Sequence, residues 1–275
     1  YDSDNDDSLY VTRQPRSPVS EAFRLLRTNL EFAGVDRPIR RILVTSAGPG
    51  EGKTTVSVNL AAIMAQGGRR VTLVDADLRR PKVHRFLGLS NKVGLSDLFR
   101  GTVDFRIVTQ QIEEVHTISV ITSGSLPPNP TELLGSARME QILEEAEKEA
   151  DIIIIDSPPS LVADVQVLAG KVDGVVMVVY PGHTQTDGAV ATLEMLNRAG
   201  ARTLGVVLNR IPRNRADYYG GYRHYSPYYS GYQYYTGEER PSRMRRLARK
   251  LSPFNHNGHK KPEESVVEAE ALEKQ

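Results

Sequence analysis

The segment that constrains this chain most is a glycine-rich run of eight residues, Gly48-Pro49-Gly50-Glu51-Gly52-Lys53-Thr54-Thr55. It follows an apolar stretch, Arg41–Thr45, and leads into Thr54–Gln66, whose apolar spacing predicts a helix. Glycines let backbone N–H groups approach phosphate oxygens closely, and the start of a helix adds positive potential there. The run therefore predicts a phosphate-binding loop, although Ala47 stands where the common pattern has glycine.

The whole loop is expected to bind a nucleotide through Gly48, Gly50, Glu51, Gly52, Lys53, Thr54 and Thr55. Lys53 would reach the β- and γ-phosphates, and the Thr54 hydroxyl would bind Mg²⁺. The competing interpretation is an ordinary glycine-rich turn, since a Gly-Lys-Thr triplet also arises by chance. The position between a strand and a helix argues against chance.

Apolar segments alternate with helical patterns through the middle of the chain. The strands expected are Arg41–Thr45, Arg70–Asp75, Thr117–Thr122, Ile152–Asp156, Gly174–Tyr180 and Thr203–Asn209. The helices expected between them include Thr54–Gln66, a segment near Thr131–Glu147 and another near Gln185–Arg198. Continuous apolar strands separated by helices indicate a parallel sheet covered on both faces. We expect an α/β fold with a doubly wound, mostly parallel sheet that binds ligands at the carboxyl ends of its strands.

Two of the expected strands end in carboxylates. Asp156 follows four isoleucines and precedes Ser-Pro-Pro, where a carboxylate can hold Mg²⁺ through water. Alone, it could equally be an aspartate that starts a turn. Asp75 and Asp77 end another strand, and their i, i+2 spacing places them on one face. One of these two could attend the metal while the other meets an acceptor hydroxyl.

The expected first helix of the domain starts at Ser17-Pro18, a capping residue followed by proline, and ends at Gly34. Glu21, Arg24 and Arg27 are spaced i, i+3 and i+6 on it and form one charged stripe. Without further context, such a stripe is an exposed helix face with a weak ion pair.

Nine tyrosines crowd a segment that has almost no aliphatic residue. They are Tyr218, Tyr219, Tyr222, Tyr225, Tyr228, Tyr229, Tyr232, Tyr234 and Tyr235. This composition cannot form a core, so we expect a disordered tail over residues 210–236. The tail could accept phosphate, form a sticky low-complexity tract, stack on single-stranded nucleic acid or be an irregular linker.

Charge is distributed unevenly around a formal net value of +1. Residues 1–16 form an acidic linker, and residues 237–275 form an extension that is first basic and then acidic. The basic part interleaves arginines with Met244, Leu247 and Leu251, so it could lie on an anionic membrane, bind a phosphorylated tail or stay solvated.

Composition excludes some classes of site and leaves the location open. The chain has no cysteine, which excludes disulfides and thiolate metal sites. No apolar run approaches the roughly 18–20 residues of a membrane span. Because the chain starts at Tyr1 without a signal-peptide pattern, we expect a fragment of a longer protein.

Together, these motifs resemble the bacterial tyrosine kinases. The resemblance rests on the phosphate-binding (Walker A) loop, Asp75-x-Asp77-x-Arg79, the apolar-Asp156-Ser-Pro-Pro segment, Glu21-x-x-Arg24-x-x-Arg27 and the tyrosine cluster. It implies a P-loop NTPase fold of the deviant-Walker, partitioning ATPase-like type over residues 17–209. It also implies ATP and Mg²⁺ as cofactors and the tyrosines of residues 210–236 as phosphoacceptors. Residues after the cluster depart from the family, in which the cluster usually ends the protein.

The same resemblance implies roles for individual residues. Lys53, Asp75, Asp77 and Asp156 would be catalytic, with Thr54, Asp75 and Asp156 at the metal and Asp77 as proton acceptor. The residues alone do not separate Asp75 from Asp77 in these roles. Arg79 would join the nucleotide site, and Asn209 resembles the adenine-contacting asparagine of the wider superfamily.

Partners follow from the resemblance as well. It implies a ring-shaped homo-oligomer joined through Glu21, Arg24 and Arg27, and a transmembrane polysaccharide co-polymerase activator, fused upstream or separate. It further implies a phosphotyrosine phosphatase, a cytoplasmic location at the inner face of the membrane and control of exopolysaccharide or capsule synthesis.

Two other functions remain in competition. A partitioning-type ATPase switch would carry a signature lysine where this chain has Gly48. An ATP-dependent scaffold that binds nucleic acid through Arg213, Arg215 and Arg223 lacks recognisable motif spacing, so no nucleic-acid partner is expected.

Overall fold

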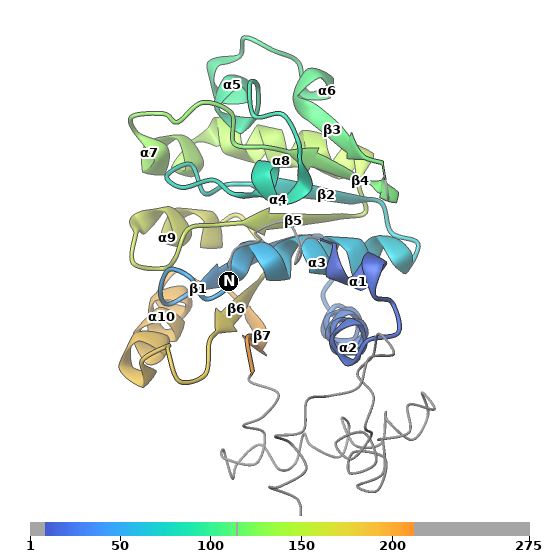
Figure 1. Cartoon of the computed structure of the whole chain (residues 1–275). Helices are drawn as coiled ribbons and strands as arrows, with labels where there is room; N and C mark the ends of the chain where they lie inside the picture. Colours follow the sequence, from blue (N-terminus) through green and yellow to red (C-terminus); the bar gives the residue numbers. More distant parts are fainter. Residues whose placement is uncertain (1–8, 114, 212–275) are drawn as a thin grey trace, which may run out of the picture. The chain divides into compact units, whose positions relative to one another are not determined.

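The computed structural model describes residues 9–113 and 115–211. This part of the chain forms a seven-stranded sheet with the order β3-β4-β2-β5-β1-β6-β7 (Figure 1). The strands are β1 (Arg41–Ser46), β2 (Val71–Asp75), β3 (Thr109–Ile112), β4 (Val115–Ile121), β5 (Ile152–Asp156), β6 (Gly174–Val179) and β7 (Thr203–Leu208). All neighbouring strands run parallel except β3 and β4, which pair antiparallel at one edge. The predicted mostly parallel α/β sheet is confirmed.

Helices precede the sheet and connect its strands. They are α1 (Tyr10–Arg13), α2 (Pro18–Ala33), α3 (Lys53–Gln66), α4 (Val83–Leu87), α5 (Leu95–Arg100), α6 (Phe105–Val108), α7 (Pro130–Gly135), α8 (Ala137–Glu149), α9 (Ala163–Ala169) and α10 (Thr186–Arg198). Among the described residues, none of these helices is long and apolar enough to cross a bilayer.

The central strands are mostly apolar because helices cover both faces of the sheet. In β5, Ile152 and Ile154 join one core, whereas Ile153 and Ile155 join the other. Helices α1 to α4 contribute to the first core and α5 to α10 to the second. In Figure 1, α3 lies beside β1 and β5, and α8 lies in the upper part of the view. The doubly wound arrangement is therefore confirmed.

Helix α2 begins and ends at the predicted residues. The Ser17 hydroxyl accepts a hydrogen bond from the Ser20 backbone N–H at 3.1 Å, and Pro18 occupies the first turn. A capping oxygen of this kind satisfies one of the free N–H groups at a helix start. The helix ends at Ala33, and Gly34 follows as its cap.

The prediction of a linker over residues 1–16 is wrong for residues 9–13. Leu9 and Val11 are only 3% and 0% exposed, and both belong to the first core. The Val11 N–H donates to Oδ1 of Asn59 on α3 at 3.0 Å. Two apolar side chains in a polar stretch are too few to produce a periodic pattern, so the sequence did not show that this segment packs on α3.

The helix predicted near residues 131–147 is two helices. Ser136 divides them, since its N–H donates to the Leu133 carbonyl at 3.1 Å while its hydroxyl accepts from Met139 N–H at 3.3 Å. Ser136 therefore ends α7 through its backbone N–H and caps α8 through its hydroxyl. Helices α4, α5 and α6 and the antiparallel strand β3 were not predicted, because each has only four to six residues.

The predictions for the remaining segments lie outside the described residues. These are the acidic residues 1–8, most of the tyrosine-rich tail and the whole extension over residues 237–275. The expected disorder of the tail stays a prediction.

Docking of α1 can be tested by a core truncation. Val11→Ala is expected to lower the free energy of unfolding by about 2 kcal/mol, because a fully buried side chain loses two methyl groups and leaves a cavity. Val35→Ala serves as control, since Val35 is 73% exposed. Urea unfolding measures both; equal midpoints for the two variants would contradict the packing of α1 on the core.

Candidate active site

Three strands bring the predicted site residues together at their carboxyl ends. Strand β1 leads into the glycine-rich loop, β2 ends at Asp75 and β5 ends at Asp156. Asp75 and Asp156 are paired in register across β2 and β5. The Ala76 N–H also donates to the Asp156 carbonyl at 2.8 Å, which extends this pairing beyond the strand ends. The carboxylates are therefore neighbours beside the loop, as predicted.

The loop folds tightly because glycine takes backbone conformations closed to other residues. Gly50 and Gly52 have φ values of 77° and 93°, in the left-handed region. Helix α3 begins directly afterwards at Lys53, so its first N–H groups face the loop interior. Lys53 is 8% exposed, and its ammonium donates to the Ser46 hydroxyl at 3.1 Å. This arrangement has the form of a phosphate-binding loop.

Asp156 lies under the first turn of α3. It is 1% exposed and accepts hydrogen bonds from the Thr54 hydroxyl at 2.7 Å and the Ser57 hydroxyl at 3.0 Å. Burial raises its pKa to about 6, while the Thr54 hydrogen bond and the Lys53 charge act in the opposite direction. The structure thus unites Thr54 and Asp156, two of the three predicted metal ligands.

The structure separates Asp75 from Asp77, which the sequence could not do. Asp75 is fully buried and accepts from Val83 N–H at 3.0 Å. Burial, followed by the charge of Asp156, raises the pKa of Asp75 well above its usual value. Asp77 is partly exposed on the loop after β2 and accepts from Arg80 N–H at 2.9 Å. Asp75 therefore faces the interior of the site, and Asp77 remains open to an incoming group.

Lys53 lies among these acidic groups in a nearly dry environment. Burial lowers its pKa, whereas the charges of Asp156, Asp77 and Glu51 oppose that shift. Two buried carboxylates and one buried ammonium are an arrangement that a divalent cation and a phosphate chain would complement.

The donor set suits Mg²⁺, which prefers oxygen ligands and keeps several waters. Thr54 and Asp156 offer a hydroxyl and a carboxylate in direct contact, with Asp75 next to them. No group of three acidic, histidine or cysteine side chains among the described residues forms a cage for a metal ion. A cation held by one or two carboxylates together with nucleotide phosphates agrees with both observations.

Arg79 points its guanidinium toward the start of α9. It donates to both carboxylate oxygens of Asp164, at 2.8 and 2.9 Å, and to the Thr131 hydroxyl at 3.1 Å. Burial acts to raise the pKa of Asp164, but hydrogen bonds from Arg79 and Thr131 hold it below its usual value. The structure thus pairs the predicted nucleotide ligand Arg79, which is partly exposed, with the fully buried Asp164, a residue that was not predicted.

Asn209 lies against the loop from the opposite side. Its Nδ2 donates to the Glu51 carbonyl at 2.9 Å, and a side chain on Gly52 would collide with the amide. The residues around it were not predicted: the Arg210 guanidinium lies 5.6 Å from the Tyr180 ring centre, and that ring stacks on His183. Their positions just after β6 and β7 were the available signal.

The predicted oligomer stripe on α2 is partly engaged within the chain. Glu21 and Arg24 form an ion pair at 2.5 Å, and both remain about one-third exposed. Arg27 instead donates to the Ile63 carbonyl of α3 at 3.1 Å. Glu21 and Arg24 therefore lie partly exposed at the surface, where Arg24 also donates to the Pro15 carbonyl at 2.5 Å, whereas Arg27 fastens α2 to α3.

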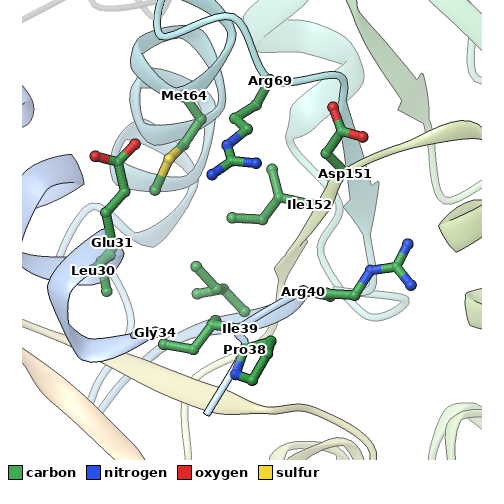
Figure 2. A pocket seen from close by; sticks show the side chains of 11 residues that line it. Leu30, Glu31, Gly34, Pro38, Ile39, Arg40, Met64, Arg69, Asp151 and Ile152 are labelled. Atoms are coloured by element: carbon green, nitrogen blue, oxygen red, sulfur yellow. The ribbon is translucent and has the colours of Figure 1, made fainter. Parts of the chain in front are cut away.

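A cavity of about 420 Å³ lies away from the predicted site. Figure 2 shows it between α2, α3 and the segments that enter β1, β2 and β5, with Arg69, Arg40 and Asp151 among its lining residues. It is thus at the amino ends of these strands, opposite the glycine-rich loop. None of the predicted site residues lines it.

Comparison with known proteins identifies the family. The tyrosine-protein kinase YwqD of Bacillus subtilis is 42% identical over 216 residues, which cover 78% of this chain and 91% of that relative. This chain belongs to the bacterial tyrosine kinases. The model of the ParA family, described as NUBPL iron-transfer P-loop NTPase, matches residues 38–212. The predicted P-loop NTPase fold of the partitioning ATPase-like type is therefore confirmed.

Solved structures agree with this membership. The kinase domain of the Escherichia coli tyrosine kinase ETK matches with a TM-score of 0.70 and 35% identity, covering 74% of this chain and 82% of that one. The chimerical protein CapA2B2 matches with a TM-score of 0.72 and 37% identity, covering 74% of this chain and 90% of that one.

The contribution of the Arg79–Asp164 ion pair to stability can be tested by truncating Arg79. Arg79→Ala is expected to destabilise the protein by about 1–2 kcal/mol, because buried Asp164 loses its charged partner while Arg79 itself is partly exposed. Arg70→Ala is the matched control, since it removes the partner of Asp151 at the surface and should leave the unfolding midpoint nearly unchanged. Equal effects of both variants in urea unfolding would contradict a special role for the Arg79–Asp164 pair.

Proposed function

We propose that this protein is an ATP-dependent tyrosine kinase that phosphorylates the cluster Tyr218–Tyr235 of its own chain. The observation that supports this most is the contrast between Asp77 and the groups beside it. Lys53, Asp75 and Asp156 are buried around the loop, as a phosphate and metal site requires, whereas Asp77 is accessible. An accessible carboxylate beside the phosphate site can accept the proton of an incoming protein hydroxyl.

Lys53 and the loop amides would hold and neutralise the β- and γ-phosphates. Phosphoryl transfer passes through a loose transition state, so positioning and charge neutralisation supply most of the catalysis. When bound, Mg²⁺ would supply further charge neutralisation across these phosphates. Asp156 and Thr54 would hold it, with Asp75 beside them.

Asp77 would accept the proton of the attacking tyrosine. The tyrosine oxygen forms a bond to the γ-phosphorus, the bond from that phosphorus to the β–γ bridging oxygen breaks, and ADP leaves. A free tyrosine has a pKa near 10, so its proton must pass to a base as the new bond forms. Asp77 is the partly exposed carboxylate at the edge of the site and therefore suits this role.

Transfer between subunits would bring the cluster to the site. We propose a ring-shaped homo-oligomer in which one subunit's tyrosines reach the next subunit's loop. The exposed pair Glu21–Arg24 supports α2 as the contact surface. Arg27 would contribute by fixing the helix to α3.

The biological setting is proposed from the relatives. Two further relatives are named putative tyrosine-protein kinases, EpsB of Ralstonia solanacearum and AmsA of Erwinia amylovora. We propose control of exopolysaccharide or capsule synthesis and export at the inner face of the cell membrane. A transmembrane co-polymerase domain would activate the kinase, and a phosphotyrosine phosphatase would reverse the reaction.

A partitioning-type ATPase switch is the second candidate, favoured by the match to the ParA family. It would transfer phosphate to water alone. Gly48 stands where that class carries its signature lysine, which favours the kinase.

Autophosphorylation can be tested by mass analysis. Incubation with ATP and Mg²⁺ is expected to add several phosphates within Tyr218–Tyr235, located by intact-mass and phosphopeptide measurements. Lys53→Met should abolish them, because the phosphates lose their buried cation. ATP turnover without phosphotyrosine in the unaltered protein would instead establish the ATPase switch.

The ring can be tested by native mass spectrometry. Arg24→Glu is expected to reduce the oligomer to smaller species, because it reverses a charge on the proposed contact surface. Arg37→Glu is the control, since Arg37 is an exposed arginine beyond the end of α2. We also expect phosphorylation to loosen the ring, because each phosphate adds about −1.5 to −2 charges. Equal oligomer size in all of these samples would contradict the proposed assembly.

A further inference from the structure

Glu51 is a buried carboxylate in the middle of the phosphate-binding loop. Glu51 follows Gly50 and precedes Gly52 in the sequence, yet it is only 1% exposed. A carboxylate removed from water is unfavourable unless hydrogen bonds or charges compensate for it. Its presence beside bound phosphates would add to that penalty, so its contacts require an explanation.

One carboxylate oxygen joins the loop to a different part of the sheet. Glu51 Oε1 accepts from the Gly48 N–H at 3.1 Å, across the loop, and from the Thr184 hydroxyl at 2.8 Å. Thr184 belongs to the turn between β6 and α10. The other oxygen, Oε2, is buried and meets no hydrogen-bond partner within residues 9–113 and 115–211.

Thr184 is itself held by its turn. Its hydroxyl oxygen accepts from Tyr180 N–H at 2.9 Å, and its own N–H donates to the Tyr180 carbonyl at 2.9 Å. A continuous series of hydrogen bonds therefore runs from the end of β6 through Thr184 and Glu51 to Gly48. The loop is therefore connected to the end of β6 through the side chains of Thr184 and Glu51.

The backbone of Glu51 is fixed from a third direction. Asn209, just after β7, donates to the Glu51 carbonyl at 2.9 Å, and its own N–H donates to the Val179 carbonyl at 2.8 Å. The loop is thus connected to the ends of both β6 and β7. The charge of Glu51 also acts to raise the pKa of Lys53 against the effect of burial.

We propose that Glu51 is a positioning residue of the phosphate-binding loop, whose carboxylate ties the loop through Thr184 to the end of β6. In this role the Glu51 carboxylate acts through the loop, while the loop backbone remains the part that binds phosphate. The carboxylate holds the loop in the shape that receives phosphates, so that less ordering is required when the nucleotide binds. The inference rests on the proposed nucleotide site but not on the identity of the phosphate acceptor.

A double-mutant cycle on the full chain tests this role. Thr184→Val removes the donating hydroxyl with little change of shape, and Glu51→Ala removes the acceptor. Each is expected to raise the dissociation constant of a fluorescent ADP analogue about tenfold, and Thr184→Val should change kcat at saturating ATP less than about threefold. The double variant should bind no more than about twofold worse than Glu51→Ala, because both changes break the same connection.

Two further variants serve as controls. Thr184→Ser keeps the hydroxyl and should bind as the unaltered protein does, and so should Thr186→Val, which changes an exposed threonine on the same segment. Additive losses, or unaltered binding in Thr184→Val, would overturn the proposal. If Thr184→Val unfolds at a lower urea concentration but binds the ADP analogue normally, the contact is merely structural and the proposal is overturned. Absence of ADP binding by the unaltered protein would instead refute the nucleotide site itself.

Discussion

The site depends on the in-register pairing of β2 and β5, which places Asp75 and Asp156 side by side in a nearly dry interior. Two neighbouring negative carboxylates repel each other, and burial raises the pKa of both. Lys53 and the hydroxyls of Thr54 and Ser57 offset part of this penalty. A magnesium nucleotide would offset more, so the strand pairing itself prepares the site for a cation.

Much of this arrangement could be predicted because it is local in sequence. The glycine loop, the apolar strands and the carboxylates after them occupy short continuous segments, and parallel strands bring their ends to one edge. The sequence therefore indicated the loop, Asp75, Asp77 and Asp156 together, as well as the sheet that holds them. What it could not decide was which of Asp75 and Asp77 is buried, since that depends on the Val83 N–H eight residues further along the chain.

The features that the sequence did not reveal depend on contacts between distant segments. Asp164 forms an ion pair with Arg79, which comes from the loop after β2. Glu51 accepts a hydrogen bond from Thr184, which comes from the turn after β6. Val11 belongs to the core that α3 also contributes to, and Asn59 of α3 accepts its N–H. None of these contacts leaves a periodic or spaced pattern in one segment, so sequence reasoning alone had no signal to use.

The proposed division of roles, with Asp75 at the buried nucleotide site and Asp77 at the acceptor tyrosine, can be tested on Asp77→Asn and Asp75→Asn. The measurement is single-turnover formation of phosphotyrosine beside the affinity for Mg²⁺-ADP. Asp77→Asn is expected to slow transfer about a hundredfold or more while its Mg²⁺-ADP affinity stays within about threefold. Asp75→Asn should instead alter Mg²⁺-ADP affinity. Transfer at the normal rate by Asp77→Asn would contradict the assignment.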